Sequence, residues 1–154
     1  MSKITLKLKE FIEGPVGISV GTRSSELKPE YCRVLGAHVL ENDVIKFFIA
    51  KSTVGETINN IKDNKLISIN FASPLSSESY QFKGENINFA DCDEAGQKRV
   101  DEYMSAFNDC IIKIGVPDGL IYKWPSNPCI AIEMNVEDIF DQTPRIGAGN
   151  RITT

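Results

Sequence analysis

The chain has 154 residues, a mass of 17.1 kDa and a hydrophobic content of 42%, which predicts one domain spanning residues 1–154 with a core of its own. Its 17 basic and 21 acidic residues give a net charge of -4, and because the lysines are scattered we expect no nucleic-acid partner. No apolar run approaches the roughly 20 residues that cross a bilayer, and the first residues lack the apolar segment of a signal peptide. We therefore expect a cytoplasmic protein with no membrane partner.

The four cysteines are widely separated and form no CxxC pair: Cys32, Cys92, Cys110 and Cys129. With a single histidine, His38, they offer no ligand set for a structural metal, so we predict none. The expected cytosolic setting predicts four reduced and mostly buried thiols. A nucleophilic cysteine with His38 as its base is the less favoured alternative, because buried cysteines are usually inert.

The first half of the chain predicts a short helix followed by three strands. Apolar residues at helical spacing mark residues 3–13, and Gly14-Pro15 ends that helix. Residues 16–23 alternate apolar and small side chains, and a loop with turn chemistry separates them from a second strand over residues 31–41. A tight turn at Asn42-Asp43 leads into VIKFFIA, residues 44–50, whose β-branched and aromatic content predicts a buried third strand.

The second half predicts two more helices and three more strands. Val54, Ile58 and Ile61 place an apolar stripe on a short helix that ends near Asn64. Strands follow over residues 66–73 and 79–90, then the longest helix over residues 93–115. A loop rich in proline and glycine precedes a last alternating strand, residues 129–136, and residues 137–154 are predicted to be an irregular tail.

Six strands and three helices, joined mostly as antiparallel neighbours, predict a mainly β fold: a barrel with helices packed outside it. The glycine-rich nucleotide-binding fingerprints GxGxxG and the P-loop are absent, and so is the zinc motif HExxH.

Several short strings occur in a fixed order along the chain. They are YCRVLGAH with Arg33, FFIA at 47–50, KST at 51–53, NNIKDN at 59–64, YQFKG at 80–84, and FDQTPRIGAG in the tail. In this order the chain resembles the pyridoxamine 5'-phosphate oxidase-like flavin-binding split barrels, over roughly residues 14–149. No single string is as specific as a phosphate-binding P-loop, and the order carries the resemblance.

The resemblance implies a six-stranded antiparallel split β-barrel and a homodimer that binds FMN in a groove between its subunits. It also implies a redox role, as an FMN-dependent oxidoreductase acting on a small-molecule substrate, although no catalytic residue can be named. The cofactor-binding positions that it implies are Arg33, Ala50, Lys51, Ser52, Thr53, Thr57, Tyr80, Gln81 and Lys83. Trp124 lies in a loop, where covering the partner subunit is the favoured role and stacking on an aromatic ligand is the alternative.

The chain departs from the family at the start of the second helix. Gly55-Glu56-Thr57 stands where better-characterised relatives have Ser-Arg-Lys, so two positive phosphate ligands are missing. One interpretation is a capping box, in which Thr53 and Glu56 satisfy each other's backbone N–H groups and close the helix start. The other is an open start, where Lys51, nearby hydroxyls and free N–H groups receive a phosphate. Arg145, which replaces a glycine of the family, would be a substitute source of positive charge.

Two further functions stay open alongside FMN binding. One is a barrel that has lost flavin binding and serves as a dimeric structural or ligand-sensing module, which the Gly55-Glu56-Thr57 sequence favours. The other is a relative that binds the deazaflavin F420, whose longer anionic tail would demand a more basic groove than this acidic chain provides.

Overall fold

A computed structural model of the chain describes residues 1–152. Its elements, in chain order, are α1 (Leu6–Ile12), β1 (Gly17–Arg23), β2 (Pro29–Arg33), β3 (Ala37–Val39), β4 (Val44–Ala50), the short 3-10 helix η1 (Lys51–Thr53), α2 (Thr57–Asn64), β5 (Leu66–Ala72), β6 (Ser79–Asp91), α3 (Glu94–Ile112), the 3-10 helix η2 (Leu120–Lys123), β7 (Cys129–Asp141) and β8 (Asn150–Arg151).

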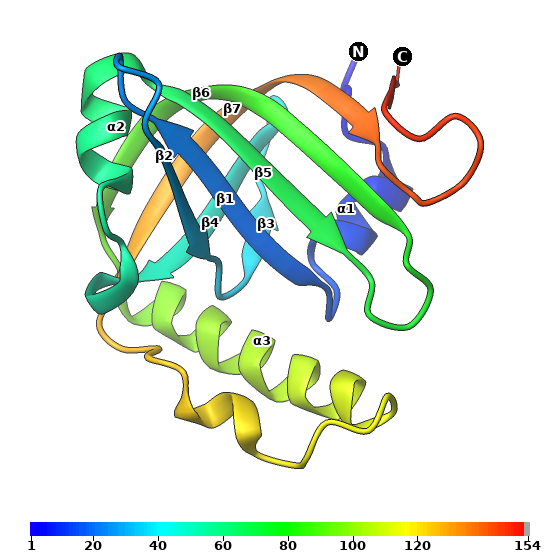
Figure 1. The fold of residues 1–154 in the computed structure, drawn as a ribbon. Coiled ribbons are helices and arrows are strands. Elements are labelled where there is room, and N and C mark those ends of the chain that lie inside the picture. Colours follow the sequence, from blue (N-terminus) through cyan, green and yellow to red (C-terminus); the bar gives the residue numbers. More distant parts are fainter. Residues whose placement is uncertain (153–154) are drawn as a thin grey trace.

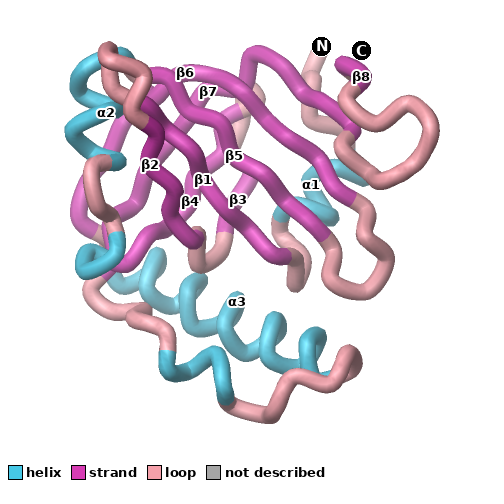
Figure 2. The backbone as a smooth tube through the Cα atoms, in the orientation of Figure 1, coloured by secondary structure: helices cyan, strands magenta, loops and turns pink. Residues whose placement is uncertain are grey.

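All strands belong to one antiparallel sheet with the order β2-β1-β5-β6-β7-β4-β3, and β8 pairs with β7. The two ends of this order are consecutive in the chain. Between them Val34 donates its backbone N–H to Ile18 of β1, and Leu35 donates to Phe48 of β4. One segment therefore pairs first with one edge of the sheet and then with the other, which curls the sheet into a barrel (Figures 1 and 2).

The inward side chains of the barrel follow the twofold period of the strands. Ile18, Val20 and Thr22 of β1 are buried, while the residues between them are half-buried. Phe71 of β5 and Phe82 of β6 meet edge to face inside the barrel, with ring centroids 5.5 Å apart. Alternation of this kind fixes the register, because a slip of one residue would turn the apolar set outward.

Three helices lie against the barrel from different sides (Figure 1). α3 lies across one end, where Arg99 donates to the Ala37 carbonyl and Tyr103 donates its hydroxyl to the Val16 carbonyl. α2 packs on β1, β2 and β5, and α1 on β3. The sheet face formed by β2, β1 and β5 stays free of helices along most of its length (Figure 1).

The prediction of a mainly β, antiparallel barrel with flanking helices is confirmed, with the predicted elements in the predicted order. The strand predicted over residues 31–41 is divided into β2 and β3, which together form one wall of the barrel. With β2 and β3 counted as one strand, the barrel has the six predicted strands, and β8 is an additional strand.

One sequence prediction was wrong. Residues 137–154 were expected to be irregular, but β7 continues to Asp141 and β8 follows. The reason is pairing with β6, where Phe82 lies opposite the buried Ile139 and supplies both the backbone partners and the apolar contact.

No helix within the described residues is long and apolar enough to cross a membrane. In the same part of the chain no three histidine, cysteine or acidic side chains gather closely enough to hold a metal ion.

A bulge in β7, where Glu137 has no partner in β6, gives a test of the barrel register. Pairing with β7 shifts between Lys83 and Gly84, and a Cβ at Gly84 would overlap the Asn135 carbonyl. We expect Gly84→Ala to lower the free energy of unfolding by about 1–3 kcal/mol or to prevent folding, because a packed backbone has to move. Urea denaturation measures this, and Gly21→Ala is the control, since its nearest atom would be 3.8 Å away. Equal stabilities of the two variants would contradict the described bulge.

Candidate functional site

The helix-free face of the sheet carries small and polar side chains in rows set by the strand register. Arg33 of β2 lies opposite Ser19, Ser19 opposite Asn70, and Asn70 opposite Gln81. This row, Arg33–Ser19–Asn70–Gln81, crosses four neighbouring strands, so its ends are roughly 14 Å apart at about 4.8 Å per strand. Its four side chains are exposed or half-buried, which makes them available to a ligand lying across the sheet.

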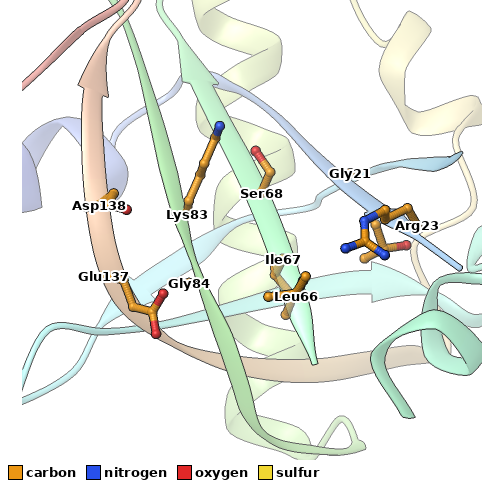
Figure 3. A pocket seen from close by; sticks show the side chains of 10 residues that line it. Gly21, Arg23, Leu66, Ile67, Ser68, Lys83, Gly84, Glu137 and Asp138 are labelled. Atoms are coloured by element: carbon orange, nitrogen blue, oxygen red, sulfur yellow. The ribbon is translucent and has the colours of Figure 1, made fainter. Parts of the chain in front are cut away.

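The next row along the strands is Tyr31–Gly21–Ser68–Lys83. Together with Arg23, Glu137 and other neighbours, most of it borders a hollow of about 480 Å³ (Figure 3). In that view Ser68 and Lys83 point the same way from adjacent strands. The glycine in this row leaves the backbone open to close approach, as a flat ligand on a sheet would require.

Arg33 lies where two further hollows meet. One, of about 340 Å³, is floored by β1 and β5 and bordered by Tyr103 and Phe107 of α3; the other, of about 250 Å³, reaches Cys32 and Thr53. Arg33 and Trp124 line both hollows. The guanidinium carbon of Arg33 lies 3.7 Å from the centroid of the Trp124 ring, a cation–π contact.

The guanidinium of Arg33 has no other partner in the described part of the chain. Within residues 1–152 it forms no ion pair and no hydrogen bond with a protein group. Many other cations are engaged: Lys51 with Asp91, for example, and Arg145 with Asp141. Arg33 therefore keeps its N–H donors available for an anion.

A carboxylate lies just before the start of α2, and it comes from a residue on another strand. The carboxylate of Glu30, on β2, accepts from the backbone N–H of Glu56 at 3.0 Å. Its other oxygen accepts from the N–H of Tyr31 at 3.1 Å. Gly55 makes this approach feasible, because a side chain there would collide with the Glu30 carboxylate.

The predicted capping box does not form. Thr53 belongs to η1 and donates its hydroxyl to the Ala50 carbonyl, and α2 begins only at Thr57. The carboxylate of Glu56 accepts from Asn59 within the same helix instead of returning to Thr53. Between β4 and α2 the chain forms the 3-10 helix η1. Thr53 and Glu56 therefore do not occupy the N-cap and third helical positions that a capping box requires.

The predicted phosphate-binding positions separate into two groups. Ser52 and Thr53 are exposed, and Thr53 borders the hollow beside Arg33. Lys51 is paired with Asp91 at 2.6 Å, and Ala50 is buried at the end of β4.

Thr57, the last of these positions, is buried. Its Oγ1 is 3.0 Å from Cys32 Sγ, with which it shares a hydrogen bond. Burial also raises the pKa of the Cys32 thiol, so this cysteine stays protonated at neutral pH.

The predicted positions on β6 also differ from one another. Gln81 faces outward in the row with Arg33, and Lys83 faces outward with its amine 5.0 Å from the Phe140 ring centroid. Tyr80 is buried, packs edge to face on Phe11 and donates its hydroxyl to Glu78 at 2.6 Å. Burial and the Glu78 carboxylate raise the pKa of Tyr80 to about 12.

His38 is not part of this site. Its Nδ1 is 3.7 Å from a Glu13 carboxylate oxygen on another side of the barrel. The sequence analysis missed Tyr31, Ser19 and Asn70, although the alternation of small or polar residues with apolar ones on β1 and β5 was a visible signal.

No family model matches the chain, and no curated protein matches it in sequence. Solved structures do match in fold. HupZ from Group A Streptococcus has 21% identity, with 96% of this chain and 98% of that chain covered and a TM-score of 0.54. An F420 reductase has 11% identity, with coverage of 85% and 94% and a TM-score of 0.55.

A putative pyridoxamine 5'-phosphate oxidase from Lactobacillus delbrueckii has 14% identity and a TM-score of 0.56, with 90% of this chain and 93% of that chain covered. At these identities the similarities establish the fold. The resemblance drawn from the sequence is thus confirmed at that level: the chain has the split-barrel fold of the pyridoxamine 5'-phosphate oxidase-like proteins.

The hydrogen bond between Glu30 and the Glu56 N–H predicts different effects for two substitutions. Glu30→Ala should lower the free energy of unfolding by about 0.5–1 kcal/mol, because the Glu56 N–H loses its acceptor. Glu30→Gln should cost less, since the amide oxygen still accepts. Urea denaturation measures both, and the control is Glu26→Ala, which changes an exposed glutamate in the loop before β2 that pairs with Lys28. A Glu30→Ala variant as stable as the control would show that the contact contributes nothing.

Proposed function

We propose that this chain binds FMN as a homodimer, with the flavin in a groove between subunits, and acts in the cytoplasm as a flavin-dependent oxidoreductase on a small molecule. The observation that carries the proposal is Arg33, an arginine that lies at the junction of two hollows and has no anionic protein partner within residues 1–152. It also occupies the position where the resemblance places a phosphate-binding arginine. A guanidinium offers a planar fork of donors that matches phosphate oxygens.

The residues on this face fit FMN in one arrangement. The phosphate belongs in the 250 Å³ hollow, against Arg33 with the Thr53 hydroxyl nearby and Ser52 beside it. It does not belong on the α2 N–H groups, because Glu30 places a carboxylate there. The row that leads from Arg33 to Gln81 then gives the ring a floor of small side chains.

Gln81 and Lys83 are the residues proposed for the polar edge of the ring. An outward glutamine donates and accepts hydrogen bonds, as the edge of a flavin ring requires. Lys83, at the end of the next row, supplies a positive charge. When bound, the flavin supplies the hydride or electron transfer, and the protein contributes binding, orientation and polar tuning.

The other predicted positions are proposed to contribute indirectly. Lys51 would have to leave Asp91 to reach a phosphate. Thr57 and Tyr80 are turned into the core, so they support Cys32 and Glu78 respectively. Ala50 ends β4 and sets the position of η1.

The homodimer is supported by the free sheet face. Tyr31 is 71% exposed and Leu66 is 39% exposed on strands whose opposite sides form the core. A face of small side chains with aromatic and aliphatic neighbours suits a self-complementary interface. The cytoplasmic setting is supported by four cysteines that form no disulfide.

A second candidate is a split barrel without flavin, favoured by the carboxylate that Glu30 holds at the start of α2. F420 is a third, favoured by the fold match to an F420 reductase. The purified protein is incubated with excess FMN, freed of unbound ligand and examined by visible absorption. Retained flavin near one per subunit supports the proposal; no retained flavin and no saturable binding in titrations with FMN would reject it, and F420 is titrated in parallel.

Arg33 gives the sharpest mutational test. We expect Arg33→Ala to weaken FMN binding by roughly 10- to 100-fold, the effect of losing charge-assisted hydrogen bonds to a phosphate. The dissociation constant is measured by quenching of flavin fluorescence. Lys28→Ala is the matched control, because it removes one positive charge from the nearby β1–β2 loop, where Lys28 is exposed and paired with Glu26. Equal affinities of the Arg33 and Lys28 variants would reject a phosphate role for Arg33.

A further inference from the structure

Trp124 is held in place from the core outward by a chain of aromatic contacts. Its ring lies 6.2 Å from that of Phe107, which in turn stacks on Tyr103 at 5.4 Å. Tyr103 is 2% exposed and donates its hydroxyl to the Val16 carbonyl at 2.8 Å. The Trp124 backbone N–H is also fixed, by the Ile121 carbonyl at 2.9 Å. The indole is therefore a rigid surface.

Arg33 uses this surface as its support. Its guanidinium carbon lies 3.7 Å from the ring centroid, so one face of the guanidinium is covered by the indole. An arginine without such support loses considerable rotamer entropy when it grips a ligand. Stacking leaves the N–H donors of the guanidinium free, because they point outward in its own plane and not toward the ring.

We propose that Trp124 is a positioning residue, which holds the Arg33 guanidinium ready for an oxyanion, in this case the phosphate monoester of the flavin. The inference rests on the proposed function for the identity of the ligand. It assigns Trp124 to the phosphate end of the site. The sequence left two other roles open for Trp124, covering the partner subunit and stacking on the flavin ring. Both make predictions that differ from those of a positioning residue.

The test compares FMN with riboflavin, which has the same ring without the phosphate. The affinity for FMN divided by the affinity for riboflavin isolates the contribution of the phosphate. We expect Trp124→Leu to lower this ratio by about 2- to 30-fold, the range of a cation–π contact. Trp124→Phe should keep most of the ratio, because phenylalanine retains an aromatic face. Arg33→Ala should lower the ratio as well, and Trp124→Leu should then change it less than about 2-fold in that background.

Other outcomes would overturn the inference. If Trp124 contacted the flavin ring or only stabilised the fold, Trp124→Leu would weaken FMN and riboflavin equally and leave the ratio unchanged. Additive effects in the double variant would show that Trp124 does not act through Arg33. If Trp124→Phe lowered the affinity ratio as much as Trp124→Leu, the aromatic face would not be what positions Arg33. Thermal denaturation of each variant confirms that folded protein is compared.

Inorganic phosphate provides a readout that does not need a flavin. Trp124 is the only tryptophan, so the fluorescence of the protein at tryptophan wavelengths reports on the Arg33 stack. Phosphate should change this fluorescence saturably in the wild type and not in Arg33→Ala, against chloride at equal ionic strength. No saturable change would overturn the anion-positioning role. A saturable change in a protein that binds no flavin would reject the proposed function and keep the role of Trp124.

Discussion

The site depends on the way the barrel closes. Between β2 and β3 the chain transfers its hydrogen bonds from β1 to β4, through Val34 and Leu35. This transfer buries four consecutive residues, 34–37, so the outward face of β2 ends abruptly at Arg33. Gly36, with a φ of 106°, makes the turn at the point where the Tyr103 side chain of α3 comes closest. The end of β2 is thus fixed against α3, and Arg33 and Trp124 meet there.

The local placement of charge matters more than the net charge in this chain. A net charge of -4 argues against a large anionic ligand. Yet several acidic residues lie next to specific cations, as Asp91 does to Lys51, Glu133 to Lys46 and Asp138 to Arg151. Such pairs neutralise both members locally, and Arg33 is left with only an aromatic neighbour. A single guanidinium beside a hollow is the charge we propose for the phosphate, and such a contact acts at short range, where more distant acidic residues are screened.

The sequence predicted what depends on local periodicity. Alternation over residues 16–23 predicted the strand β1, and in the structure the twofold period places Ile18, Val20 and Thr22 in the core. It could not show that residues 31–41 divide into two strands, since that division depends on pairing with β4 as well as β1. Nor could it show that β7 continues to Asp141. Residues 137–154 were predicted to be an irregular tail, and the register against β6 shows that residues 137–141 continue the strand.

Single residues of the candidate site could be predicted from the sequence, but the contacts between them could not. Arg33 and Gln81 were identified from the resemblance, and the register places them in one row. Trp124 is 91 positions from Arg33 in the sequence, and nothing local predicts that they stack. The contact just before α2 is also between residues distant in sequence: Glu30 reaches the Glu56 N–H over a separation of 26 residues. A motif such as a capping box describes neighbours in sequence, so it misses a carboxylate supplied by another strand.

The two charges of β2 explain why we propose an anion site at the strand end and not at the helix start. Glu30 and Arg33 are three residues apart, so they point to opposite sides of the strand. Glu30 reaches the start of α2, where its carboxylate meets the Glu56 N–H, and Arg33 faces the open sheet. A carboxylate bound to backbone donors at one place is not available to neutralise a guanidinium at another. The contact that holds the Glu30 carboxylate beside the start of α2 therefore also leaves Arg33 without a carboxylate partner from its own strand.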